Sequence, residues 1–138
     1  MIVRPYSIIL DAEALSLLAA GARRMQAWVT VARRTDSILY ASALTLAEVT
    51  DGTARDALVR RAMGAVRVEP VGVEIGYAAG RLRARASKIR RKHRNLTVDA
   101  VVAATALTLP APTLVLTSDA DDLTLLLADS AVRVESIE

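Results

Sequence analysis

Short apolar runs alternate along the chain with longer segments in which apolar residues recur every three or four positions. The runs have the length of buried parallel strands, and the spaced segments have the period of amphipathic helices. The expected strands span residues 7–10, 37–42, 66–71, 113–117 and 132–137. The expected helices span residues 12–20, 22–34, 45–51, 53 to about 64, one or two within 72–94, 97–109 and 119–129. Strands separated by helices predict an α/β fold with a central, mostly parallel sheet and helices on both faces.

Glycine, proline and hydroxyl residues mark the expected boundaries. Gly21 divides the first two helices, and Gly52 is expected directly after the 45–51 helix, where glycine commonly follows a last turn. Thr53 and Asp56 have the spacing of a capping box, which predicts the start of the next helix. Pro70 lacks a backbone N–H, so the 66–71 strand is expected at an edge of the sheet.

The composition narrows the available chemistry. The 138 residues are 53% hydrophobic, which suits a single domain over residues 1–138 with an aliphatic core. The chain has no cysteine, which excludes disulfides, cysteine-zinc sites and a thiol nucleophile. Its one histidine, His93, excludes a site with several histidine ligands. Aspartate and glutamate therefore remain as the candidates for metal binding or acid–base chemistry.

No membrane segment is expected. Asp11 and Glu13 interrupt the apolar run near the amino terminus and spoil a signal-peptide core. The uncharged stretch 100–118 is long enough to span a bilayer, but Pro110 and Pro112 divide it into a helix and a strand. The sequence predicts a cytoplasmic protein.

Basic residues are concentrated in one segment. The formal net charge is +3, yet residues 81–94 hold eight basic side chains and no acidic one, so the rest of the chain has a net charge of −5. This asymmetry favours a polyanionic partner. With helical spacing, Arg81, Arg85, Lys88 and Lys92 share one face and are candidates for contacts with RNA phosphates. The alternative is a solvated basic helix, because the other four basic residues lie elsewhere around it.

Four acidic residues are expected at one rim of the sheet. Asp11 and Asp119 follow two expected strands, Glu48 lies in the helix after a third, and Asp99 lies in the first turn of the 97–109 helix. The carboxyl ends of parallel strands share one edge, where ligands gather. Carboxylates suit Mg²⁺ or Mn²⁺, which can activate water and neutralise charge on a phosphodiester.

Each acid also has a purely structural interpretation. Asp11 and Asp99 stand at helix amino termini, where the helix dipole favours any carboxylate. Asp121 has capping-box spacing from Ser118, and Glu48 could be a surface residue of its helix. Spacing alone leaves both interpretations open.

Four segments together resemble the PIN domain family, and within it the VapC-type toxins of bacterial toxin–antitoxin pairs. The resemblance covers nearly the whole chain. The segments are IILDAEAL at 8–15, SALTLAEV at 42–49, LTVDAVVAATAL at 96–107 and LVLTSDADDL at 114–123.

The resemblance implies a three-layer α/β/α fold that commonly forms homodimers. It also implies Mg²⁺- or Mn²⁺-dependent endoribonuclease activity that leaves a 5′-phosphate, under the control of a cognate antitoxin. Asp11, Glu48, Asp99 and Asp119 match the family's acidic quartet, with Asp11, Asp99 and Asp119 as the implied metal ligands. The resemblance gives supporting roles to Thr117, beside the fourth acid, and to Asp122.

Two positions depart from the family pattern. Many relatives have a hydroxyl side chain directly after the first aspartate, whereas this chain has Ala12. Glu13 adds an acid that the pattern does not assign.

Two other functions compete with the nuclease. One is a non-catalytic RNA-binding or regulatory module of the same fold, which loss of any quartet member would favour. The other is a phosphatase-like enzyme that uses Asp11 as a nucleophile toward small phosphomonoesters and forms a phosphoaspartate.

Overall fold

The structure is a computed structural model that describes residues 4–89 and 95–138. Its centre is a five-stranded sheet in the order β3-β2-β1-β4-β5, and every pair of neighbouring strands is parallel. The strands are β1 (Ser7–Leu10), β2 (Ile38–Ser42), β3 (Val66–Glu69), β4 (Thr113–Thr117) and β5 (Arg133–Ser136). All five expected strands are present, and the predicted α/β class is confirmed.

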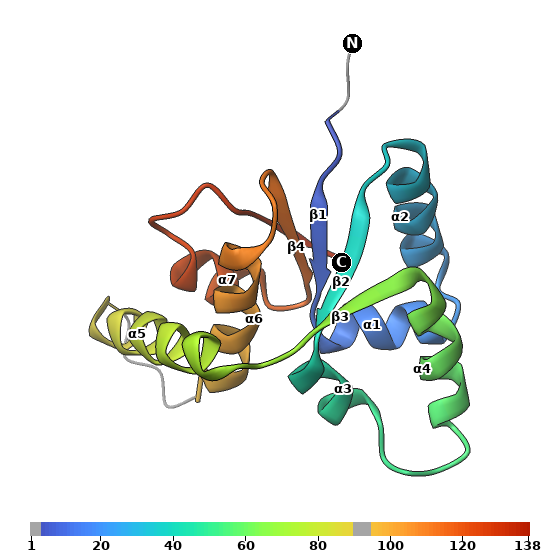
Figure 1. Ribbon diagram of the computed structural model, residues 1–138, viewed down its shortest axis with the longest axis horizontal. Helices are drawn as coiled ribbons and strands as arrows, with labels where there is room; N and C mark the ends of the chain where they lie inside the picture. Colours follow the sequence, from blue (N-terminus) through green and yellow to red (C-terminus); the bar gives the residue numbers. More distant parts are fainter. Residues whose placement is uncertain (1–3, 90–94) are drawn as a thin grey trace.

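Helices cover both faces of the sheet and make the fold three-layered (Figure 1). The first group lies on one face: α1 (Ala12–Ala19), α2 (Arg23–Arg34), α3 (Ala43–Val49) and α4 (Asp56–Ala62), which continues into the 3-10 turn η1 (Met63–Ala65). The second group lies on the other face: α5 (Val73–Ile89), α6 (Thr97–Thr108) and α7 (Ala120–Leu126).

Alternate residues of the strands build two separate cores. Ile9, Tyr40 and Val115 face the cluster formed with α5, α6 and α7. Their neighbours along the strands, such as Ile8 and Leu116, face the cluster formed with α1 and α2. The period of two along each strand sends successive side chains to opposite faces, so a strand covered on both sides is apolar throughout.

Helix α6 is buried around most of its circumference. Residues 100–106 are all buried, six of these seven are alanine or valine, and the helix packs against α5, α7 and the sheet. A helix that is apolar on all sides belongs in an interior, and small side chains let its neighbours approach closely. Most of α6 belongs to the uncharged stretch 100–118, which the structure divides into α6 and β4. No helix in the described parts of the chain is long and apolar enough to cross a membrane.

The predicted ends of α3 and the predicted capping box before α4 are wrong. Helix α3 begins at Ala43 rather than at residue 45, because the Ser42 hydroxyl accepts a hydrogen bond from the Leu44 N–H at 3.2 Å and caps the helix. The helix ends at Val49, so Gly52, with φ +81°, lies in the following loop. Thr53 and Asp56 form no capping box, because the Asp56 carboxylate accepts instead from the N–H groups of residues 51 and 52 at 3.0 and 2.9 Å.

The strand order brings the ends of β1 and β4 together. From β1 the chain moves outward through β2 to β3, which is an edge strand as expected but ends at Glu69, before Pro70, rather than at residue 71. It then crosses the other face and returns to β4 on the opposite side of β1 before reaching β5. The connections diverge between β1 and β4, and in such sheets ligands bind outside the carboxyl ends of the strands at this switch point.

Candidate active site

Asp11 is the first residue beyond β1 and is buried, with 7% of its surface exposed. Its Oδ1 accepts a hydrogen bond from the Ala14 N–H at 2.9 Å and caps α1, so the structural interpretation of this acid is correct. Its Oδ2 accepts from the Thr117 hydroxyl at 2.6 Å and from the Ser118 N–H at 3.1 Å. Capping therefore occupies one oxygen, while the other connects β1 to the end of β4.

Thr117, at the end of β4, connects Asp11 to Asp119. Its fully buried Oγ1 donates to Asp11 and accepts a hydrogen bond from the Asp119 N–H at 2.8 Å. One side chain thus positions both the Asp11 carboxylate and the backbone that carries Asp119.

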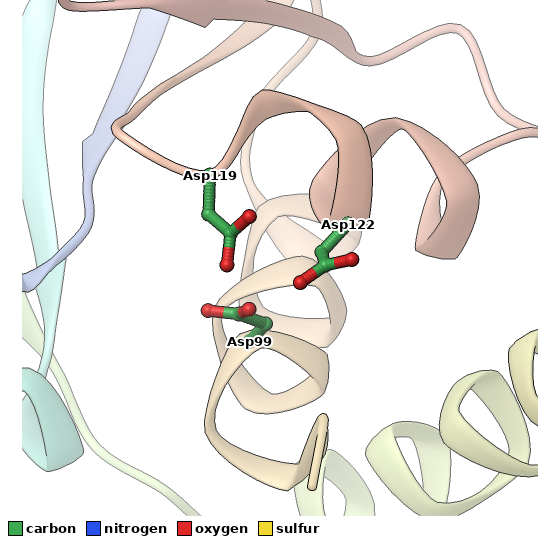
Figure 2. Close-up of side chains that lie close together, drawn as sticks. All are labelled: Asp99, Asp119 and Asp122. Atoms are coloured by element: carbon green, nitrogen blue, oxygen red, sulfur yellow. The ribbon is translucent and has the colours of Figure 1, made fainter. Parts of the chain in front are cut away.

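Three aspartates meet beside this pair. Asp99 comes from the first turn of α6, Asp119 from the connection between β4 and α7, and Asp122 from the first turn of α7. Figure 2 shows their carboxylates directed toward one another. One oxygen from each lies within 4.8 Å of the others, and Asp122 is buried while Asp99 and Asp119 are partly exposed.

The donor set of this aspartate cluster (Asp99, Asp119 and Asp122) suits a hard divalent cation. Oxygens bound to one Mg²⁺ at about 2.1 Å stand roughly 3 to 4 Å apart, so small side-chain movements bring these three into range. At the separation of 4.8 Å each pair of ionised carboxylates repels by about 3 kcal/mol with an effective dielectric constant of 20. A divalent cation offsets that repulsion for all three pairs at once.

Glu48 stands at the same rim on α3. Its side chain is mostly exposed, yet partial burial, and secondarily the negative charge of Asp11, raise the pKa of Glu48 above its usual 4.5. Helix α3 follows β2, and β2 is the parallel neighbour of β1, so Glu48 stands at the same end of the sheet as Asp11. The structure therefore brings together all four acids of the predicted quartet in one region, although Asp11 and Glu48 stand outside the aspartate cluster.

Two further acids lie apart from the cluster. Glu13 is exposed in the first turn of α1, and Asp121 is exposed in the first turn of α7. The predicted capping box between Ser118 and Asp121 is absent, because α7 begins after Asp119 and the Ser118 N–H donates to Asp11 instead. Asp122 is the neighbour that the turn of α7 directs inward.

The basic segment is only partly described. Arg85 forms an ion pair with Asp129 at 2.9 Å and donates to the Leu126 carbonyl at 3.1 Å, so it ties α5 to the end of α7. Arg81 and Lys88 are exposed on the same helix. Lys92, like the other residues of 90–94, lies outside the described part of the chain. Of the four predicted phosphate contacts, Arg85 thus has a structural role that spacing alone did not reveal.

The site stands apart from a large cavity. A cavity of about 720 Å³ opens near the amino-terminal ends of β2 and β3, at the opposite edge of the sheet. Its lining includes Arg33, Arg61 and Arg67 but no acidic residue. The acids therefore lie at the other end of the strands from this cavity, at the carboxyl-terminal rim.

Comparisons with known proteins agree with this arrangement. Similar folds are seen in FitAcB from Neisseria gonorrhoeae, with 22% identity over 91% of this chain and 96% of that chain (TM-score 0.63). DNA-bound VapBC from Salmonella typhimurium has 12% identity over 96% of this chain and 99% of that chain (TM-score 0.68). VapBC2 from Rickettsia felis, bound to a promoter DNA fragment, has 9% identity over 94% and 97% (TM-score 0.69).

These structural relatives show the fold, and the comparison with curated proteins gave no match. The family comparison is more specific, since the match extends over residues 8–125 and so includes β2, β3, β4 and nearly all of β1, together with the quartet and Asp122. The family it describes is the PIN domain, and this chain belongs to that family.

Proposed function

We propose that this PIN-domain protein is a Mg²⁺- or Mn²⁺-dependent endoribonuclease and the toxin of a toxin–antitoxin pair. The observation that carries the proposal is the meeting of Asp99, Asp119 and Asp122 within 4.8 Å beside the buried Asp11. PIN domains are generally nucleases, and this donor set fits the divalent cation that such nucleases typically use.

The aspartate cluster would hold the ion, and Asp11 would join it directly or through water. A carboxylate has about four lone-pair positions, and three hydrogen bonds occupy three of those on Asp11, which leaves one on Oδ1. The bound ion would supply activation of water and neutralisation of charge on the phosphodiester. Glu48, with its raised pKa, is a stronger proton acceptor than an ordinary glutamate and would orient the attacking water.

RNA is the proposed substrate and a 5′-phosphate the proposed product. Arg81 and Lys88 on α5 are exposed and available for backbone phosphates, which give sequence-independent affinity. The open position of the acids suits a single strand passing over the rim. We expect the protein to act in the cytoplasm, as a homodimer.

A protein antitoxin is the proposed partner. FitAcB and the DNA-bound VapBC complexes share the fold of this chain, which supports a corresponding partner here. A small upstream reading frame that encodes a DNA-binding protein would supply it, and that protein should copurify with the chain and suppress cleavage. Neither competing function requires such a reading frame.

The competing functions fit the site less well. A non-catalytic RNA-binding module would not need the quartet, and all four of its acids are present. A phosphatase nucleophile needs a carboxylate oxygen that a substrate can reach, whereas Asp11 is buried, with 7% of its surface exposed, and one of its oxygens caps α1. Turnover of a small phosphomonoester with trapping of a phosphoaspartate at Asp11 would favour the phosphatase.

The test is RNA cleavage by purified wild type and Asp99→Asn, each with Mg²⁺ and with EDTA. Asp121→Asn is the matched control, because Asp121 is an exposed aspartate of α7 that lies outside the cluster. We expect cleavage by the wild type and the control with Mg²⁺ only, and a loss of at least a hundredfold in Asp99→Asn that folds normally by circular dichroism. Undiminished cleavage in EDTA or by Asp99→Asn would overturn the proposal.

A further inference from the structure

One face of α3 points into the seam between the two cores. Leu44 packs against the core on the α6 side, whereas Leu46 and Val49 pack against the core on the α1 side. At 100° per residue, Thr45 and Glu48 lie between these two sets on the helix circumference. Both residues therefore lie on the side of α3 between the two cores, where Thr45 is fully buried and Glu48 is exposed.

The Thr45 hydroxyl is unusual among the helical threonines. Thr45 has no exposed surface, and its Oγ1 has no hydrogen-bond partner among the described residues. By contrast, the hydroxyl of Thr105 donates to the Val101 carbonyl at 2.8 Å, and that of Thr50 donates to the Leu46 carbonyl at 2.6 Å. A buried hydroxyl is satisfied in nearly all native proteins, by protein or by ordered water, so an exception needs an explanation.

A water molecule explains the exception, because the surroundings supply further polar partners. Glu48 lies one turn further along the same face, and its pKa responds to the charge of Asp11. A buried water needs two to four such partners. Mg²⁺ keeps several of its waters when it binds to proteins, so the rim of the proposed metal site is where ordered water is expected.

We propose that Thr45 is a positioning residue of the metal site: its hydroxyl and the Glu48 carboxylate hold one water molecule that belongs to the hydration shell of the ion. This inference rests on the proposed function. Thr45 touches neither substrate nor ion, and it acts by fixing the water and the rotamer of Glu48. Groups in this outer position commonly change metal affinity ten- to a hundredfold when they are removed.

The test compares Mn²⁺ binding without RNA, by calorimetry or by electron paramagnetic resonance, in Thr45→Val, Thr45→Ser and the wild type. Valine keeps the shape and removes the hydroxyl, whereas serine keeps the hydroxyl. We expect Mn²⁺ affinity to fall about tenfold in Thr45→Val and to stay within twofold in Thr45→Ser. Thr105→Val is the matched control, a buried helical threonine whose hydroxyl is satisfied by its own helix, and its Mn²⁺ affinity should not change.

Three outcomes overturn the inference. Mn²⁺ affinity that is unchanged in Thr45→Val, together with a higher melting temperature in EDTA, would show a merely unsatisfied hydroxyl. Equal losses in the valine and serine variants would show a packing effect. No binding of Mn²⁺ to the wild type would overturn the proposed metal site itself, and with it this inference. Thr45→Ala replaces the valine variant if the latter does not fold.

Discussion

Replacing Thr117 by valine should remove the hydroxyl that connects the Asp11 carboxylate to the backbone of Asp119. The side chain is fully buried, donates to Asp11 at 2.6 Å and accepts from the Asp119 N–H at 2.8 Å. Valine fills the same space without either hydrogen bond. A hydrogen bond to a charged group contributes about 1.5–3 kcal/mol, and the second partner also loses its acceptor, so Thr117→Val should lower the free energy of unfolding by about 3 kcal/mol.

Thr117→Ser is the control, because it keeps the hydroxyl and loses one buried methyl group, which contributes about 1 kcal/mol. Urea unfolding at pH 7 in EDTA, followed by circular dichroism, measures both variants without a contribution from metal binding. The expected difference between them is about 2 kcal/mol, or roughly 30-fold in the unfolding constant. Equal stability of the two variants would refute the connecting role of the hydroxyl.

Three other expectations follow from the described contacts. Arg85→Ala should lower the free energy of unfolding by about 1 kcal/mol in urea titrations, because it breaks the partly exposed ion pair with Asp129, and should leave RNA affinity little changed. Charge reversal at Arg81 and Lys88 should weaken RNA binding and reduce the slope of log affinity against log salt by roughly one to two, whereas an unchanged slope would indicate a solvated face. The raised pKa of Glu48 means that the folded protein disfavours its ionised form, so this residue destabilises the fold as pH rises above 4.5 and has no such effect below it. In EDTA, Glu48→Gln should therefore match the wild type in melting temperature at acidic pH and exceed it at pH 7; equal melting temperatures at pH 7 would contradict the assigned surroundings of Glu48.

The strands and the layers followed from the sequence because their signal is local. Apolar runs such as residues 7–10 and 113–117 need only their own composition to indicate burial, and Pro70 marks the edge strand by itself. The ends of α3 and α4 did not follow, since several polar residues compete for the same N–H groups. The Ser42 hydroxyl caps the start of α3. The Asp56 carboxylate accepts a hydrogen bond from the preceding loop and forms no capping box with Thr53.

The candidate site also has one part that was predictable from the sequence and one part that was not. The positions of Asp11 and Asp119 at one rim of the sheet were predictable from strands that run parallel, whereas the adjacency of β1 and β4 was not, because the sequence does not determine the strand order. The placement of Asp122 within the cluster depends on where α7 starts, and the ion pair of Arg85 depends on a contact 44 residues away. Spacing within a helix describes which residues share a face, but only the packing of α5 against α7 decides which of them meets an acid.

We propose that the aspartate cluster makes this chain a metal-dependent ribonuclease. The most direct measurement is 5′-end mapping of cellular RNAs after induced expression of the wild type and of Asp99→Asn at equal protein levels. We predict new 5′-phosphate ends at defined RNA positions with the wild type and none with Asp99→Asn. The same new ends in both samples, or no new ends in either, would contradict it.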